Sequence, residues 1–138
     1  MNHKSNKRFL ALFLFLPLFG KATPDISLEV YRYQSDATSY IEVSLYVVGS
    51  TLLCDSMKMG EYGITYLVMV RNEQQEVVAG NRYRLTAMGC PPKDIMDVKR
   101  FSVPSGRYTV ELEAVDVTDT SGSVSMEVPV EIPEDVSS

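Results

Sequence analysis

Few side chains in this chain can perform acid-base or nucleophilic chemistry. The 138 residues include one histidine, His3, two cysteines, Cys54 and Cys90, and no tryptophan. His3 lies in residues 1–22, which have the pattern of a cleavable export signal, so the mature product would have no imidazole. This loss excludes Ser-His-Asp and Cys-His catalytic sites and zinc sites with histidine ligands. The serines lie in no nucleophile-elbow motif, and no glycine-rich phosphate loop follows a strand. We therefore expect no catalytic residue, no cofactor and no enzymatic activity.

Carboxylates are the remaining candidates for catalysis or for a metal site. Four of them fall on the polar positions of alternating segments, where we expect a solvated face: Glu111, Glu113, Asp116 and Glu127. A separate oxygen-rich group could hold calcium at one end of the fold: Asp116, Asp119, Ser121 and Ser123. Its spacing matches no established calcium loop, and we expect a solvated turn.

The sulfur-containing residues allow three interpretations. Cys54 and Cys90 would form a disulfide in an oxidising compartment, closing a loop of 36 residues. They could instead be two buried thiols that pack as small hydrophobic groups. Cys54, Met57 and Met59 also offer the soft ligands that Cu(I) prefers, with Met88 elsewhere in the chain, but we expect no resident metal.

Tyrosine is the one enriched residue type. All eight tyrosines follow residue 22, where Phe101 is the only phenylalanine. Four of them fall on or beside the polar positions of the first two expected strands: Tyr31, Tyr33, Tyr40 and Tyr46. Such a group could bind a protein or stack on a sugar, or it could reflect the preference of tyrosine for half-exposed strand positions.

The amino-terminal segment and the charge predict the compartment and limit the partners. Lys4, Lys7 and Arg8 precede an apolar run over 9–19, and Gly20 and Ala22 supply small residues near a cleavage site. We therefore expect a signal peptide at 1–22, a β-sandwich domain at 23–135 and a loose tail at 136–138. The run is too short to span a bilayer, so no transmembrane segment is expected. Residues 23–138 hold nine basic and 18 acidic side chains, which argues against nucleic acid as a partner.

Alternation of apolar and polar residues from position 26 onward predicts strands rather than helices. Seven strands are expected, at 26–31, 41–47, 63–71, 76–86, 98–103, 107–114 and 123–132. The segment 63–71 is apolar on both faces and should lie in mid-sheet, with a hairpin loop at 72–75 and a bulge or bend at Gly80 and Asn81. Residues 88–94 should form a crossover loop, and Pro129 marks an edge strand. The predicted fold class is an all-β antiparallel sandwich of immunoglobulin-like size with seven to eight strands, with a small barrel as the alternative.

One turn has a clear local signal. Pro104 and Gly106 occupy positions that a tight turn favours, and Tyr108 follows at the head of the next strand. We expect Tyr108 to pack in the core. The alternative is a tyrosine corner, in which its hydroxyl group bonds to nearby backbone.

Several short segments together resemble one family. They are VYRY at 30–33, YIEV at 40–43, DVKRF at 97–101, PSGRYT at 104–109 and VEIP at 130–133. In this order they resemble the amino-terminal β-sandwich region of exported bacterial GWxTD-domain proteins, over most of residues 24–135. The motif that names the family is missing, because the chain has no tryptophan. The resemblance implies a location in the envelope or periplasm of a two-membrane bacterium and transfers no functional residues.

These observations predict an exported, non-enzymatic module that binds another envelope protein or a partner domain. A carbohydrate-binding module that uses the outward tyrosines is the second hypothesis, and a Cu(I)-binding domain is the third.

Overall fold

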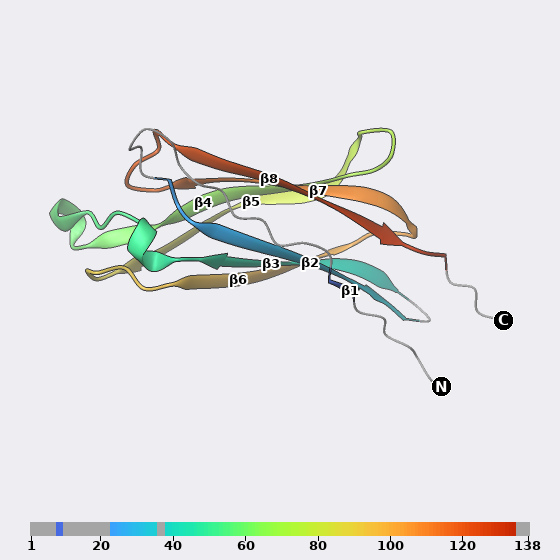
Figure 1. The fold of residues 1–138 in the computed structure, drawn as a ribbon, viewed down its shortest axis with the longest axis horizontal. Coiled ribbons are helices and arrows are strands. Elements are labelled where there is room, and N and C mark those ends of the chain that lie inside the picture. The colour runs from blue at the N-terminus through green and yellow to red at the C-terminus, as the bar shows by residue number, and fades with distance from the viewer. Residues whose placement is uncertain (1–7, 10–22, 36–37, 135–138) are drawn as a thin grey trace.

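The structure, a computed structural model, describes residues 8–9, 23–35 and 38–134. It confirms the all-β prediction, because seven antiparallel strands form two sheets that pack face to face as a β-sandwich (Figure 1). We call the sheet of β2, β3 and β6 sheet A, to which a two-residue strand, β1, is added, and we call the other sheet B. The strands of sheet A are β1 (Arg8–Phe9), β2 (Ile26–Gln34), β3 (Ser39–Val47) and β6 (Ile95–Ser102). The strands of sheet B are β4 (Glu61–Arg71), β5 (Val77–Met88), β7 (Gly106–Asp116) and β8 (Ser123–Ile132).

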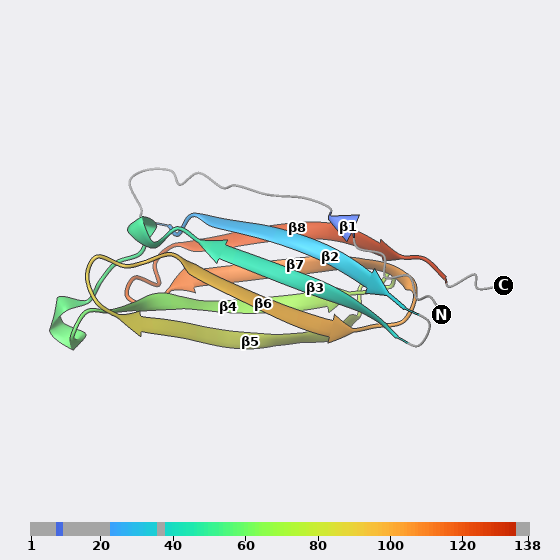
Figure 2. The same cartoon turned by 90° about the horizontal axis from the view of Figure 1, so that it is seen from below.

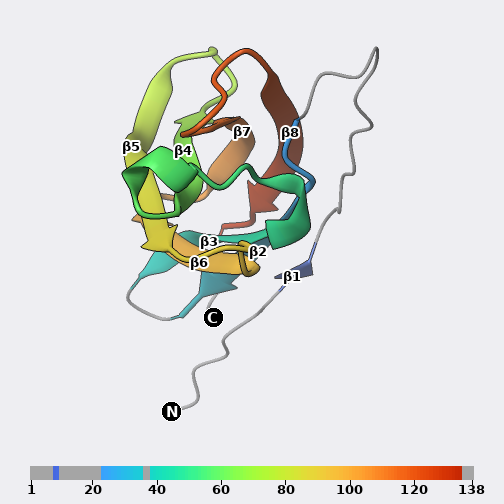
Figure 3. The same ribbon diagram turned by 90° about the vertical axis from the view of Figure 1, so that its left-hand side faces the viewer.

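The spatial order of the strands is β1-β2-β3-β6 in sheet A and β5-β4-β7-β8 in sheet B (Figure 2). Viewed end-on, the two sheets enclose a single core (Figure 3). β2 lies close along β8 at one side of the sandwich, whereas β5 and β6 approach each other at few positions on the opposite side. The sandwich is therefore closed along one side and more open along the other.

The core forms because β2, β3, β4, β7 and β8 bury alternate side chains. In β8 the pattern is fully regular, with five apolar side chains buried and the polar residues between them exposed. The inward residues of sheet A are Ile26, Leu28, Val30, Ile41, Val43, Leu45, Val47 and Phe101. Those of sheet B are Tyr62, Ile64, Tyr66, Val68, Val70, Tyr108, Val110, Leu112, Ala114, Val124, Met126, Val128, Val130 and Ile132. This set covers both inner faces, as the alternation predicts.

The observed strands differ from the expected ones mainly at their ends. β6 begins at Ile95, three residues before the expected start, and residues 89–94 make the predicted crossover between the sheets. The bulge of β5 lies at Val78 rather than at Gly80 and Asn81, because Ala79 pairs with Val70 while Val77 pairs with Arg71. Gly80 instead allows the backbone of β4 to approach closely. A Cβ atom there would lie 2.3 Å from the carbonyl oxygen of Val68, so no larger residue fits.

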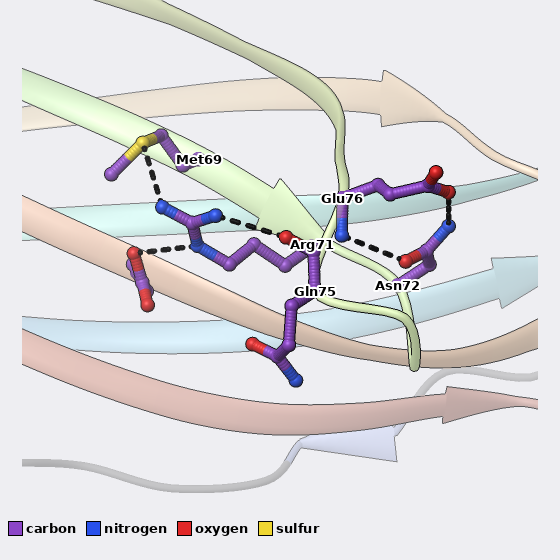
Figure 4. Close-up of polar contacts among 6 residues, drawn as sticks. Met69, Arg71, Asn72, Gln75 and Glu76 are labelled. Atoms are coloured by element: carbon purple, nitrogen blue, oxygen red, sulfur yellow. Dashed lines mark hydrogen bonds and ion pairs between the residues drawn. The ribbon is translucent and has the colours of Figure 1, made fainter.

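β4 lies in mid-sheet as predicted, but its outer face is half-exposed rather than covered. Arg71 lies along this face, with its Nη2 atom 3.7 Å from Met69 Sδ and its Nε atom donating to Glu111 Oε1 at 3.1 Å (Figure 4). The β4–β5 loop has its own bonds. Asn72 Oδ1 accepts the backbone N–H of Glu76 at 3.0 Å, and Arg71 Nη1 donates to the carbonyl oxygen of Gln75 at 3.1 Å. A long arginine therefore provides the cover that a second layer was expected to give.

The irregular segment between β3 and β4 forms two short 3-10 turns, η1 (Gly49–Thr51) and η2 (Ser56–Lys58). Asp116 of β7 holds this segment in place. Its Oδ2 atom accepts the backbone N–H of Leu53 at 2.9 Å, and its Oδ1 atom accepts that of Thr118 at 2.7 Å. The prediction that Asp116 lies on a solvated face is wrong, because it continues the inward phase of Leu112 and Ala114 and is only 2% exposed.

Cys54 and Cys90 form the predicted disulfide, with their Cα atoms 5.9 Å apart. The bond joins the irregular segment after β3 to the crossover loop between β5 and β6. Both segments lack regular pairing at these residues, so the disulfide connects two parts of the chain that the sheets do not hold.

Some predictions concern residues that the structure describes little or not at all. The predicted signal peptide at 1–22 lies outside the described residues except for Arg8–Phe9, which pair with Arg32 and Tyr31 at the edge of β2. The predicted tail at 136–138 also lies outside them. Within the described part of the chain, no helix has the length and apolar character needed to cross a membrane.

Replacing Asp116 by alanine is expected to destabilise the fold. The change leaves two backbone N–H groups without their carboxylate acceptor in a buried place, which costs about 2 to 3 kcal/mol of unfolding free energy. Chemical denaturation of the variant and of Glu113→Ala measures the effect. Glu113 lies on the exposed face of the same strand, so its replacement should change stability by less than about 0.5 kcal/mol. Equal effects of the two substitutions would contradict this role for Asp116.

Removing the disulfide is also expected to destabilise the protein. Closing a loop over a sequence separation of 36 residues restricts the unfolded chain, which corresponds to about 3 to 4 kcal/mol in the chain-entropy model. The Cys54→Ser/Cys90→Ser variant should lose this amount in urea denaturation. Adding a reductant should destabilise the parent protein but not the variant. A variant as stable as the parent would show that the bond contributes nothing.

Candidate surface on the outer face of sheet A

The four tyrosines singled out in the sequence share the outer face of sheet A. Tyr33 pairs with Tyr40 across β2 and β3, and Tyr31 pairs with Glu42. Tyr46 lies further along β3, between Ser27 of β2 and Met96 of β6. Tyr31, Tyr40 and Tyr46 each adjoin a buried residue of their strand, and Tyr33 is in phase with Tyr31, so all four side chains project away from the core. The tyrosines nevertheless divide into two groups with different surroundings.

The first group is a stack at one end of the face. The rings of Tyr33 and Tyr40 lie 4.9 Å apart with an interplanar angle of 19°. The guanidinium carbon of Arg100 lies 5.5 Å from the centre of the Tyr40 ring. Tyr33 approaches from β2 and Arg100 from β6, the strands on either side of β3, so both sides of the Tyr40 ring have a neighbour from this chain.

Glutamates organise the polar groups around this stack. Arg100 Nε donates to Glu42 Oε1 at 3.0 Å, and this hydrogen bond is the main reason that the pKa of Arg100 is raised. The hydroxyl of Tyr31 donates to Glu29 Oε1 at 3.0 Å, which raises the pKa of that tyrosine. Charged side chains of the protein itself therefore surround the stack.

The second group lies at the other end of the face and is more apolar. Met96 is 72% exposed and Val98 is 46% exposed, both on the outer face of β6, and Tyr46 stands beside them on β3. A shallow hollow of about 290 Å³ lies between these strands and β2, and its lining includes Tyr46, Met96 and Ser44. We call the exposed residues Tyr46, Met96 and Val98 the β6 patch.

Asp94 fixes the position of Tyr46 beside this patch. The Tyr46 hydroxyl donates to Asp94 Oδ2, and the backbone N–H of Gly49 donates to Oδ1 at 2.7 Å. These two bonds, the tyrosine first, lower the pKa of Asp94, and the carboxylate in turn raises the pKa of Tyr46. The ring is thereby held by the crossover loop that leads into β6.

The turn residues behave as structural elements. Tyr108 is buried, and its hydroxyl donates to the carbonyl oxygen of Pro104 at 2.6 Å. The two alternatives for this residue are thus both realised, since it packs in the core and also bonds to backbone upstream. Gly106 has φ +156°, and a Cβ atom there would lie 3.3 Å from the Tyr108 hydroxyl, so glycine leaves room for the ring.

The residues considered for metal binding have other partners or lie apart. With Cys54 bonded to Cys90, neither sulfur is available as a thiolate, and Met57 is 92% exposed in the η2 turn. Of the oxygen-rich group, Asp116 holds two backbone N–H groups, and Asp119 accepts both the backbone N–H and the hydroxyl of Ser121. Ser123 begins β8. Within the described residues, no cluster of three His, Cys, Asp or Glu side chains has metal-binding geometry.

The structure reveals one polar cluster that the sequence interpretation missed. Asp97 and Lys99 of β6 pair with Leu45 and Val43, so they point into the space between the sheets. Asp97 accepts the hydroxyl of Tyr66 and lies 3.4 Å from Lys99 Nζ. Lys99 Nζ lies 4.5 Å from the centre of the Tyr83 ring. The signal was present in the sequence, because both residues are in phase with the buried Phe101.

This inward cluster links the two sheets at the more open side of the sandwich. Charged side chains that point inward from an edge strand oppose pairing with another sheet, and β6 is the edge strand of sheet A. Tyr66 is 1% exposed, and burial, followed by its bond to Asp97, raises the pKa of its hydroxyl well above the ordinary value of 10.0.

Comparison with protein-family models, with curated protein sequences and with solved structures finds no match to this chain. The resemblance to GWxTD-domain proteins therefore stays a prediction. The surface has to be interpreted from its own chemistry.

The buried Tyr66 hydroxyl predicts a stability loss in alkali. Its pKa is higher in the folded than in the unfolded state, so its contribution is complete below pH 10 and decreases as the pH rises above that value. In Tyr66→Phe, the slope of unfolding free energy against pH above 10 should be smaller by about 1.4 kcal/mol per pH unit, the value for one proton. Urea denaturation at a series of pH values measures it. An unchanged slope would show that Tyr66 ionises as readily in the folded protein as in the unfolded chain.

Proposed function

We propose that this protein is a non-enzymatic extracytoplasmic module that binds another protein of the cell envelope through the β6 patch. The observation that carries the proposal is the exposure of Met96 and Val98 side by side on the edge strand of sheet A. Exposed apolar side chains next to a tyrosine are typical of protein-binding surfaces. No such apolar group is needed on the solvent face of a small sandwich, where polar residues suffice.

The geometry of the tyrosines favours a protein over a carbohydrate. A sugar platform needs an aromatic face that is open to solvent, but the Tyr40 ring has Tyr33 on one side and Arg100 on the other. Tyr46 is held by Asp94, and the hollow beside it is lined by the apolar Met96 and Leu45 as well as by the polar Ser27, Glu29 and Ser44. The carbohydrate-binding hypothesis is therefore kept as an outcome of the test.

Export is part of the proposal and is supported by two observations. The Cys54–Cys90 disulfide is of the kind that persists in oxidising compartments, and the first 22 residues have the pattern of an export signal. The resemblance to the amino-terminal region of GWxTD-domain proteins would place the module in the envelope of a two-membrane bacterium.

We also propose that the sandwich is immunoglobulin-like in its topology. The strand orders β2-β3-β6 and β5-β4-β7-β8 support this, as does the bond from Tyr108, at the start of β7, to the carbonyl oxygen of Pro104. Immunoglobulin-like modules frequently serve as binding or spacer domains, although such a fold alone does not define a function.

Replacing the two apolar residues on β6 by glutamate should strongly weaken binding of the partner. The full sequence is expressed with a photo-crosslinking residue in place of Ser44, which lines the hollow, and the adduct formed in living cells is identified by mass spectrometry. We expect one envelope protein as the main adduct. Met96→Glu/Val98→Glu should reduce its yield at least about tenfold, because charges then oppose desolvation of the interface.

The control matches the residue types on other exposed sites. Met57→Glu/Val77→Glu introduces the same charges at a methionine and a valine that are also exposed, 92% and 51%, but lie outside the β6 patch. This variant should leave the adduct unchanged. Retention of glycans without any protein adduct would favour the carbohydrate hypothesis, and equal losses in both double variants would remove the β6 patch from consideration.

A further inference from the structure

Basic residues are concentrated on the open side of this acidic protein. Residues 77–103, which form β5, the crossover loop and β6, hold five basic and two acidic side chains. The rest of residues 23–138 holds four basic and sixteen acidic side chains. The strands and loop on this side therefore carry more basic than acidic side chains, although Lys99 points inward to Asp97 and Arg100 is bonded to Glu42. The five basic residues are Arg82, Arg84, Lys93, Lys99 and Arg100.

A groove lies at one end of this side, between the end of β5 and the start of β6. Its volume is about 590 Å³, and it is lined by the ends of β5 and β6 and by the crossover loop between them. Both strands are the outermost strands of their sheets, so each presents an edge at the groove. The apolar part of the lining is Tyr62, Leu85, Ile95 and Met96. Met96 also lines the hollow on the outer face, so the groove and the β6 patch share this residue.

Two cations at the groove are available to a ligand. Arg84 is paired with Glu61 at 3.6 Å, but its side chain is 58% exposed, and such exposed pairs contribute little to stability and exchange readily. Lys93 has no ion-pair partner among the described residues. The nearby carboxylate of Asp94 is engaged by Tyr46 and by the backbone of Gly49. The groove therefore combines an apolar floor with two cations at its margin.

From this geometry we infer that the groove between β5 and β6 binds an extended acidic segment of the partner protein. The inference rests on the proposed function, because it names the chemistry of the partner. An extended chain points alternate side chains to opposite sides, so apolar residues would face Leu85 and Ile95 while acidic residues reach Arg84 and Lys93. Backbone groups of the segment would pair with an open strand edge, as in β-strand addition. The charge contrast between this side and the remaining surface argues for an acidic segment.

The test uses a labelled ten-residue peptide that alternates valine and glutamate. It is titrated into the protein expressed from its full sequence, and binding is followed by fluorescence anisotropy. We expect saturable binding that weakens with rising ionic strength, because exposed charges are screened by salt. A peptide with glutamine in place of every glutamate should bind at least about tenfold more weakly.

Charge reversal locates the site. Arg84→Glu/Lys93→Glu should weaken binding at least about tenfold. The matched control is Arg107→Glu/Lys58→Glu, since Arg107 is likewise an exposed arginine in a weak pair with a glutamate, at 3.8 Å, and Lys58 is an exposed lysine outside the groove. The control should bind the peptide as the parent protein does. Circular dichroism and thermal unfolding verify that both variants are folded.

Other outcomes would overturn the inference. Absence of peptide binding at millimolar concentration, or equal weakening by both double variants, would remove the groove as an acidic-segment site. Heparin that displaces the labelled peptide as effectively as unlabelled peptide does would indicate a general polyanion surface instead. If the parent self-associates in sedimentation and only Arg84→Glu/Lys93→Glu prevents this, a second copy is the occupant. A Ser44 adduct that persists while the peptide fails to bind would reject this inference and leave the proposed function standing.

Discussion

Five strands of this sandwich have one buried apolar face, and packing of these faces against each other is the constraint on which the rest depends. Alternating side chains in β2, β3, β4, β7 and β8 are almost fully removed from water. Each buried aliphatic or aromatic side chain contributes about 1.5 to 3 kcal/mol relative to an exposed one. The outer faces make no such contribution, so they can vary in composition. The surface that we propose for binding accordingly lies on an outer face and at an edge.

The gap between the two sheets is treated differently on the two sides of the sandwich. On the β2 and β8 side, Arg32 donates to the carbonyl oxygen of Glu131 at 2.6 Å and Gln34 to that of Pro133 at 2.5 Å, so side chains close the gap. On the β5 and β6 side, the inward Asp97 and Lys99 keep the inter-sheet space polar at the edge. Inward charges on an edge strand discourage indiscriminate pairing with another sheet. The exposed Met96 and Val98 lie beside the less closed side, where a selective partner would find apolar contact.

Much of the fold could be predicted because the alternation has a period of two. The positions of β2, β3, β7 and β8, the edge role of Pro129 and the mid-sheet position of β4 are confirmed. The predictions of exposure are wrong where polar residues occupy the inward positions of the alternation. Asp116 was assigned to the surface because of its residue type, although its phase follows Ala114. Asp97 and Lys99 were not recognised for the same reason, because hydrophobicity alone does not reveal a charge that has a buried partner.

The sequence by itself determined which residues alternate, and hence that strands with one buried face would form and that the tyrosines of β2 and β3 would project outward. It also carried the two cysteines and the uneven distribution of charge along the chain. Only the tertiary structure decided that Tyr40 is enclosed by Tyr33 and Arg100, that Tyr66 meets Asp97, and that β5 and β6 border one groove. The reason is physical. Periodicity is a property of neighbouring residues, whereas these contacts join segments that become neighbours only when two sheets stack and their edges align.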